Sequence, residues 1–142
     1  EVCKAPSHHF PAGKSVVSGE VLFSMGCCRT FEGTHAQSWQ SLTTLMALPD
    51  DTLNHCAHEY TAANGAFALT LEPNNIALIE RMKAVKQLRR DNKPTVPSTV
   101  GQEKQTNPFL RPMSEEIQGT LGMIGGPLPA IFSQIRKLKD TF

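Results

Sequence analysis

Residues 55–61 read HCAHEYT and place two imidazoles and a thiol close together in the chain. Histidine and cysteine are ligands for zinc, but successive strand residues point to opposite faces. His55, Cys56 and His58 therefore cannot all face one ion unless the chain bends. The segment also lacks the helical, glutamate-bearing signature of a zinc protease. By spacing alone, ordinary loop chemistry is the better interpretation.

Glu20 is a second candidate, because it follows a glycine in the apolar segment KSVVSGEVLF. A carboxylate at the carboxyl end of a strand is well placed to bind or bridge cations. A solvated turn residue is the simpler interpretation, and the sequence by itself favours it. His8 and His9 offer two further imidazoles, for which an exposed pair near the first residues is the default.

Positive side chains that could hold the carboxylates of a small anionic ligand occur at Arg29, Arg136 and Lys139. Arg136 and Lys139 are three residues apart, so they share one face of a helix. Cations are also favoured at the end of a helix by its macrodipole. Without further information, a solvated helix end is the better interpretation of this pair.

The elements that must position these residues begin as alternating strand and helix. Residues 14–23 are β-branched and apolar around a Ser-Gly-Glu break, which predicts a buried strand that ends in a turn near Glu20. Thr34 can cap a helix, whose apolar residues at helical spacing are Trp39, Leu42, Leu45 and Met46. Residues 53–57 predict a second buried strand, with His58 at its end.

The pattern changes after Asn75, because no convincing strand follows it. A long helix capped by Asn74 is predicted from one apolar face, which consists of Ile76, Ile79, Met82, Val85 and Leu88. The proline-bearing connector KPTVPST follows, and helices are predicted at 115–124 and 128–139. The C-terminal half is therefore predicted to be helical.

Size and composition narrow the class of protein. The 142 residues suit one domain, or one domain with a small appendage. A formal net charge of +1 gives no broad attraction to nucleic acid or anionic lipid. We see no membrane span and no export leader, so neither nucleic acid nor membrane is an expected partner, and the expected location is cytoplasmic. The chain opens at Glu1 without methionine, so its beginning is not taken as a natural domain edge.

Several motifs, in order along nearly the whole chain, resemble the hydroxyacylglutathione hydrolases, the glyoxalase II family of the metallo-β-lactamase superfamily. They are GEVLFSMGCCRTFEGT, LPDDTLNHCAHEYTAANGAFAL, EPNN, PTVPSTVGQEKQTNPFLR and RKLKDTF. The CAHEYT and KDTF forms are similar to the bacterial type. The family fold is an αββα sandwich followed by a helical domain. The resemblance implies an α+β chain, with residues 1–65 as the second half of the sandwich and residues 66–142 as the helical glutathione-binding domain.

The activity that the resemblance implies is hydrolysis of S-D-lactoylglutathione to glutathione and D-lactate by water activated at a binuclear site of zinc, iron or manganese. By motif position, His58 is a metal ligand, and Glu20 occupies the place of the bridging carboxylate. His9 is the ligand implied by the family's Gly-His-Thr segment. His55 and Cys56 are then structural. The implied glutathione contacts are Arg29, Phe31, Tyr60, Asn64, Arg136 and Lys139.

Departures from the family pattern bear on activity. Nothing in the sequence matches Thr-His-x-His-x-Asp-His, which supplies most of the metal ligands. Glu20 replaces aspartate, and a displacement of about 1 Å can lower a rate roughly a hundredfold. Phe31 lacks a tyrosine hydroxyl, and Cys28 stands where glycine is usual, which predicts strain if the turn needs positive φ.

Whether the chain is an enzyme is therefore left open. We expect the C-terminal portion of a thioester hydrolase, weak or inactive alone, with the missing N-terminal half of the fold as its expected partner. The alternative is a non-catalytic remnant or subunit that binds glutathione conjugates or a partner chain.

Overall fold

The computed structural model describes residues 6–30 and 33–142, so the predicted contact Phe31 lies outside the described residues. The fold is α+β, as predicted. In chain order the elements are β1 (His8–Phe10), η1 (Pro11–Gly13), β2 (Ser15–Gly19), β3 (Leu22–Phe23), β4 (Gly26–Cys27), α1 (His35–Met46), β5 (Leu53–Cys56), α2 (Thr61–Leu71), α3 (Ile76–Arg90), β6 (Ser98–Thr99), α4 (Val100–Thr106), η2 (Pro108–Leu110), α5 (Glu115–Leu121) and α6 (Leu128–Thr141).

The main sheet is mixed and has the strand order β1-β2-β5-β6. Its central pair, β2 and β5, is parallel, and Gly19 is the register partner of Cys56 at the carboxyl ends of the two strands. The strand predicted from residue 14 onward ends in a turn near Glu20, as expected, because Gly19 has a φ of 54° and turns the chain. Beyond the turn, β3 pairs with β4 as a separate antiparallel hairpin.

The expectation that no strand follows Asn75 was wrong. Ser98–Thr99 pairs antiparallel with β5, and Asn54 is the register partner of Ser98. A strand of two residues leaves no periodic pattern in a sequence, so this pairing could not be predicted. The predicted boundary between residues 65 and 66 falls inside α2. Assignment of the sheet to half of an αββα sandwich stays a prediction.

Local sequence explains where the helices begin and end. Thr34 caps α1 in a capping box with Gln37, as expected from its position before the apolar repeat. The cap of α3 is Asn75 rather than Asn74, because the Asn75 side chain accepts the Leu78 N–H at 3.2 Å. The helix therefore begins one residue later than expected. Gly122, with a φ of 65°, ends α5 three residues before the predicted position.

The buried face of α3 also differs from the prediction. Ile76 is 74% exposed, whereas Leu78 is fully buried. The first residue of a helix faces few neighbours, so helical spacing alone assigned Ile76 to the wrong environment. Lys86, Arg89 and Arg90 are exposed, as expected for surface cations.

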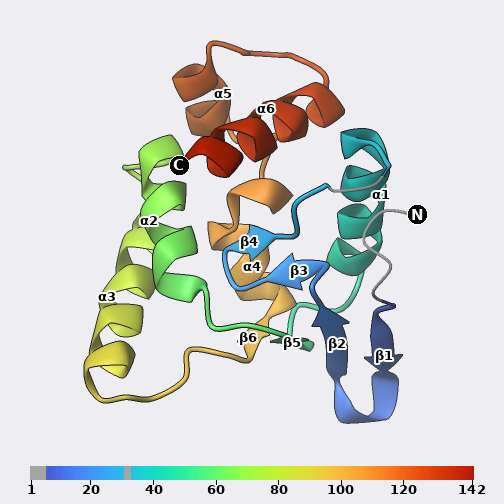
Figure 1. Ribbon diagram of the computed structural model, residues 1–142, viewed down its shortest axis with the longest axis vertical. Coiled ribbons are helices and arrows are strands. Elements are labelled where there is room, and N and C mark those ends of the chain that lie inside the picture. The colour runs from blue at the N-terminus through green and yellow to red at the C-terminus, as the bar shows by residue number, and fades with distance from the viewer. Residues whose placement is uncertain (1–5, 31–32) are drawn as a thin grey trace.

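Helices flank the two small sheets, and the β1–β2 hairpin extends beyond them (Figure 1). The helices α2 and α3 lie side by side on one flank, α1 lies on the other, and α6 contacts α1. The larger of two buried hydrophobic clusters draws on strands and helices and includes Leu22, Leu42, Phe67, Phe109, Phe132 and Ile135. The smaller one lies between α2, α3 and Met25. In the described part of the chain, no helix combines the length and apolar character needed to cross a membrane. The packing of α6 brings Arg136 against Cys27 of β4.

Candidate functional site

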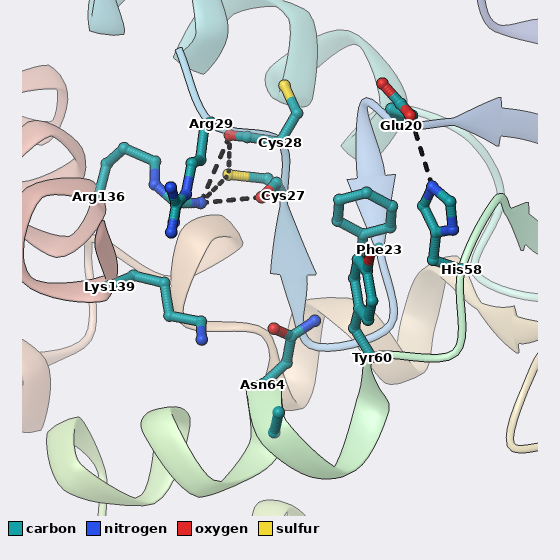
Figure 2. A pocket seen from close by; sticks show the side chains of 11 residues that line it. Glu20, Phe23, Cys27, Cys28, Arg29, His58, Tyr60, Asn64, Arg136 and Lys139 are labelled. Atoms are coloured by element: carbon teal, nitrogen blue, oxygen red, sulfur yellow. Dashed lines mark hydrogen bonds and ion pairs between the residues drawn. The ribbon is translucent and has the colours of Figure 1, made fainter. Parts of the chain in front are cut away.

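A cavity of about 480 Å³ lies where the carboxyl ends of β2 and β5 meet the β3–β4 hairpin and the helices α2 and α6 (Figure 2). All predicted site residues in the described part of the chain line it, with the exception of His9. The lining residues are Glu20, Phe23, Cys27, Cys28, Arg29, His58, Tyr60, Ala63, Asn64, Arg136 and Lys139. The predicted residues, which are far apart in the sequence, therefore share one cavity.

Glu20 and His58 meet at one edge of the sheet. Because β2 and β5 are parallel neighbours, the residues that follow them emerge at the same edge. The Ala57 N–H donates to the Gly19 carbonyl at 2.9 Å and holds the two turns together. His58 Nε2 lies 3.4 Å from Glu20 Oε1, and the side chains are 44% and 55% exposed. An imidazole and a carboxylate thus face the solvent side of the cavity together.

The donors in the described residues do not complete a metal site. His9 lies on β1 opposite Val16 and is not brought to Glu20 and His58. Over residues 6–30 and 33–142, no group of three or more His, Cys, Asp or Glu side chains could hold a metal ion. A catalytic zinc ion uses three protein ligands and an open position, and Glu20 and His58 are only two. The assignment of His9 as a ligand stays a prediction.

Three aromatic rings form the middle of the cavity. Tyr60 stacks on His58 with ring centroids 5.0 Å apart and an interplanar angle of 22°. Phe23 meets Tyr60 edge to face at 5.5 Å. Phe23, His58 and Tyr60 are called the aromatic cluster below. Phe23 was not predicted as a site residue, because an apolar residue that ends a strand is most often a core residue.

Glu59 anchors the turn that carries His58 and Tyr60, a role that was not predicted from the sequence. It lies between His58 and Tyr60 in the chain and accepts the Thr95 N–H at 2.6 Å. Burial alone would raise the pKa of Glu59, but the hydrogen bonds from Thr95, with help from Thr61, outweigh it and lower the pKa. The anchored carboxylate holds residues 58–61 against the segment around Thr95 that precedes β6. Nothing in the local sequence pairs Glu59 with a residue 36 positions away.

The other end of the cavity carries positive charge. Arg136 is 3% exposed, and its Nη1 donates to the Cys27 carbonyl at 2.8 Å. Its Nη2 pairs with Asp140 at 2.8 Å, and the guanidinium lies 4.8 Å from the centroid of the Phe109 ring. The interpretation of Arg136 as a solvated helix end is therefore corrected. Arg29 is more exposed and lies 3.5 Å from the same Asp140 carboxylate.

Lys139 completes the cationic end, which consists of Arg29, Arg136 and Lys139. Its ammonium lies 5.6 Å from the centroid of the Phe67 ring. Burial lowers the pKa of Lys139, and the nearby positive charges of Arg136 and Arg29 lower it further, against an opposing effect of Asp140. An anionic ligand would relieve this repulsion, so the cationic end is suited to carboxylates.

Asn64 joins α2 to the hairpin. Its Nδ2 donates to the Ser24 carbonyl at 3.1 Å. A Cβ atom at Gly26 would lie 2.4 Å from the same Nδ2, so this approach requires glycine. A contact between Asn64 and a ligand stays a prediction. The conditional expectation of strain at Cys28 is not met, since positive φ in described non-glycine residues is confined to Lys14, Met25 and Asn92.

Comparison with known proteins agrees with the motifs. The chain matches the family model described as Hydroxyacylglutathione hydrolase C-terminus over residues 59–142, more than half of its length. It is 50% identical over 133 residues to a hydroxyacylglutathione hydrolase of Methylococcus capsulatus, which covers 94% of this chain and 52% of that protein. The Rhizobium meliloti protein of the same name is 46% identical over 149 residues, covering 100% of this chain and 58% of that protein. The chain spans about half the length of these curated relatives and corresponds to their C-terminal portion. The chain belongs to the hydroxyacylglutathione hydrolase family.

Proposed function

We propose that this chain is the glutathione-binding portion of a hydrolase that converts S-D-lactoylglutathione to glutathione and D-lactate. The observation that carries the proposal is a single cavity that joins the cationic end to the Glu20–His58 pair. Glutathione is a tripeptide with two carboxylates, which suit the cationic end. The thioester then lies along the aromatic cluster, toward Glu20 and His58.

Within this proposal, the cations have different tasks. Arg29 and Lys139 bind the ligand carboxylates directly, because their side chains are the more accessible ones. Arg136 contributes its charge while its N–H groups remain bonded to Cys27 and Asp140. Tyr60 and Asn64 are the remaining proposed contacts in the described residues, and Phe31 is a proposed contact outside them. Residues 66–142, which hold Arg136 and Lys139, are the proposed helical glutathione-binding domain.

The proposed cofactor of the whole protein is zinc, iron or manganese, with Glu20 and His58 among its donors and His9 as a further candidate. Because two donors are too few for a catalytic metal site, we propose that the ligands other than Glu20, His58 and the candidate His9 come from outside the described residues. The partner that we propose for them is the N-terminal half of the family fold. We therefore propose that this chain alone hydrolyses the thioester weakly or not at all.

A second candidate function is non-catalytic binding of glutathione conjugates or of a partner chain. The absence of a group of three or more metal-ligating side chains in residues 6–30 and 33–142 favours it. The two candidates share the cavity and differ only in whether added donors give turnover.

The test combines calorimetric titration of the purified chain with glutathione and a hydrolysis assay on S-D-lactoylglutathione with added zinc, iron or manganese. We expect saturable binding and turnover close to the uncatalysed rate. Loss of one charge-assisted bond in Arg29→Ala or Lys139→Ala should weaken binding about tenfold. Lys86→Ala, which removes an exposed cation of α3, should leave binding unchanged.

Two results would contradict the proposal. Undetectable binding of glutathione would remove the ligand assignment. Bound metal at about two ions per chain together with rapid hydrolysis would show that this chain supplies enough donors by itself.

A further inference from the structure

The β3–β4 hairpin, which forms the wall between the two ends of the cavity, is anchored by a buried ion pair. Arg81 of α3 and Glu103 of α4 approach with Nη2 and Oε1 2.7 Å apart. Their side chains are 5% and 0% exposed. Neither residue lines the cavity.

Each residue from Phe23 to Gly26 is hydrogen-bonded to this ion pair or to its neighbour Asn107. Glu103 Oε2 accepts the Met25 N–H at 2.9 Å, and Arg81 Nη2 donates to Ser24 Oγ at 2.8 Å. Asn107 Nδ2 donates to Glu103 at 2.9 Å and lies 3.1 and 3.3 Å from the carbonyls of Gly26 and Phe23. Arg81, Glu103 and Asn107 are called the hairpin network below.

The hairpin network is not explained by stability. Moving two charges out of water is so unfavourable that replacing a buried ion pair by apolar residues of similar size is often neutral or stabilising. Met25, in contrast, has a φ of 57°, a conformation that L-residues other than glycine rarely adopt. The carboxylate of Glu103 satisfies the N–H of this strained residue. The pair therefore acts on the geometry of the turn.

We propose that Arg81 and Glu103 are positioning residues for ligand binding, which act through the hairpin without touching the ligand. By fixing the turn at Met25, they keep Phe23 against Tyr60 and the Cys27 carbonyl against Arg136. The identity of the ligand as a glutathione compound rests on the function proposed above. The positioning role itself rests only on the contacts of the hairpin network.

The test separates positioning from stability with two double variants. Arg81→Met with Glu103→Met removes the ion pair without leaving an unpaired charge. Its matched control is Glu72→Met with Arg111→Met, which removes a second ion pair, 2.8 Å long, whose Glu72 side chain is 2% exposed. That pair ties α2 to η2 and α5 and has no hydrogen bond to the hairpin.

Both double variants should unfold within a few degrees of each other. Calorimetry should show that glutathione affinity falls about tenfold in the Arg81/Glu103 variant and is unchanged in the control. A loss of this size is usual for residues that act on a site without touching its ligand. Nuclear Overhauser contacts between the Phe23 and Tyr60 rings should be lost in the first variant and kept in the second. If the first variant does not fold, Ser24→Ala, which removes one contact of Arg81 with the hairpin, should weaken affinity about fivefold.

The inference would be overturned if a folded Arg81/Glu103 variant kept both its glutathione affinity and its ring contacts. The same result in Ser24→Ala would overturn it if the double variant does not fold. So would equal losses in the control, because they would show general destabilisation. If the unaltered chain binds no glutathione, the proposed function fails. The ring contacts then decide the positioning role by themselves, since they need no ligand.

Discussion

At the scale of single residues, Lys139 is the group whose charge the cavity perturbs most clearly. Burial, followed by the positive charges of Arg136 and Arg29, lowers its pKa from the ordinary value of 10.5. A lysine attracts a carboxylate only below its pKa, where the ammonium is charged. As the pH rises, ligand affinity should therefore begin to fall at a pH below 10.5. The total loss of affinity should be about tenfold, as for one lost charge-assisted bond.

The measurement is a series of titrations with S-methylglutathione, which has no titrating thiol, from neutral pH to pH 10.5. Lys139→Arg is the control, because a guanidinium stays charged throughout this range and the ligand's own titration is the same for both proteins. The decline in affinity should be shallower in this variant. Identical profiles would show that Lys139 does not bind the anion.

Apolar strand patterns predicted that Glu20 and His58 each follow a strand, whereas only the resemblance implied that they share one site. The parallel register of β2 and β5 brings them to the same edge of the sheet. Arg136 shows the opposite case. Its sequence position fits a solvated helix end, but contacts with Cys27, 109 residues away, and with the Phe109 ring make it a buried residue. Long-range contacts of this kind leave no local pattern, so the resemblance predicted the residue but the local sequence could not predict its environment.

At the scale of elements, the contact between the hairpin and α2 depends on the absence of a side chain at Gly26. An alanine Cβ there would lie 2.4 Å from Asn64 Nδ2 and would push Asn64 off the Ser24 carbonyl. Gly26→Ala should therefore lower the free energy of unfolding by about 1–3 kcal/mol, the usual range for overpacking. Urea denaturation measures this change.

Gly13→Ala is the matched control, because a Cβ at Gly13 meets nothing within 4 Å. It should change the free energy of unfolding by less than about 0.5 kcal/mol, as is usual for surface substitutions. Equal effects of the two substitutions would mean that the hairpin and α2 can separate without loss. In that case the cavity wall would be less firmly held than its hydrogen bonds indicate.

Elements with clear apolar repeats could be predicted, and elements defined by partners could not. The repeat of α1, with its cap at Thr34, and the short apolar stretch of β5 gave both elements nearly correct bounds. The helix α2 was missed because its sequence TAANGAFALTL is apolar around most of its surface, which hides the periodicity of one face. Ser98–Thr99 becomes a strand only because β5 lies beside it.

At the scale of the whole molecule, Glu72 ties α2 to η2 and α5 through Arg111 and Ser114. Burial alone would raise the pKa of Glu72, but the bonds from Arg111 and Ser114 outweigh it and lower the pKa below its ordinary value of 4.5. The unfolded chain then binds the proton more tightly than the folded one. The stability that Glu72 contributes is present above pH 4.5 and is lost as the pH falls through the lowered pKa.

The free energy of unfolding should therefore decline as the pH falls below 4.5, and the decline should be smaller in Glu72→Gln. Glu80→Gln, at the exposed ion pair with Lys83, is the control and should keep the slope of the unaltered chain. Urea titrations at several acidic pH values give these slopes. Equal slopes in all three proteins would exclude Glu72 as a source of acid sensitivity.

The cavity unites parts of the molecule that are made at very different times. The ribosome synthesises the hairpin with Cys27 before α6, because Arg136 and Lys139 follow Cys27 by 109 or more residues. Synthesis proceeds from the N-terminal side, so a nascent chain contains Arg29, Phe23, His58 and Tyr60 long before it contains Arg136 and Lys139. Under the proposed function, a glutathione compound therefore meets the complete cationic end only after α6 has been made.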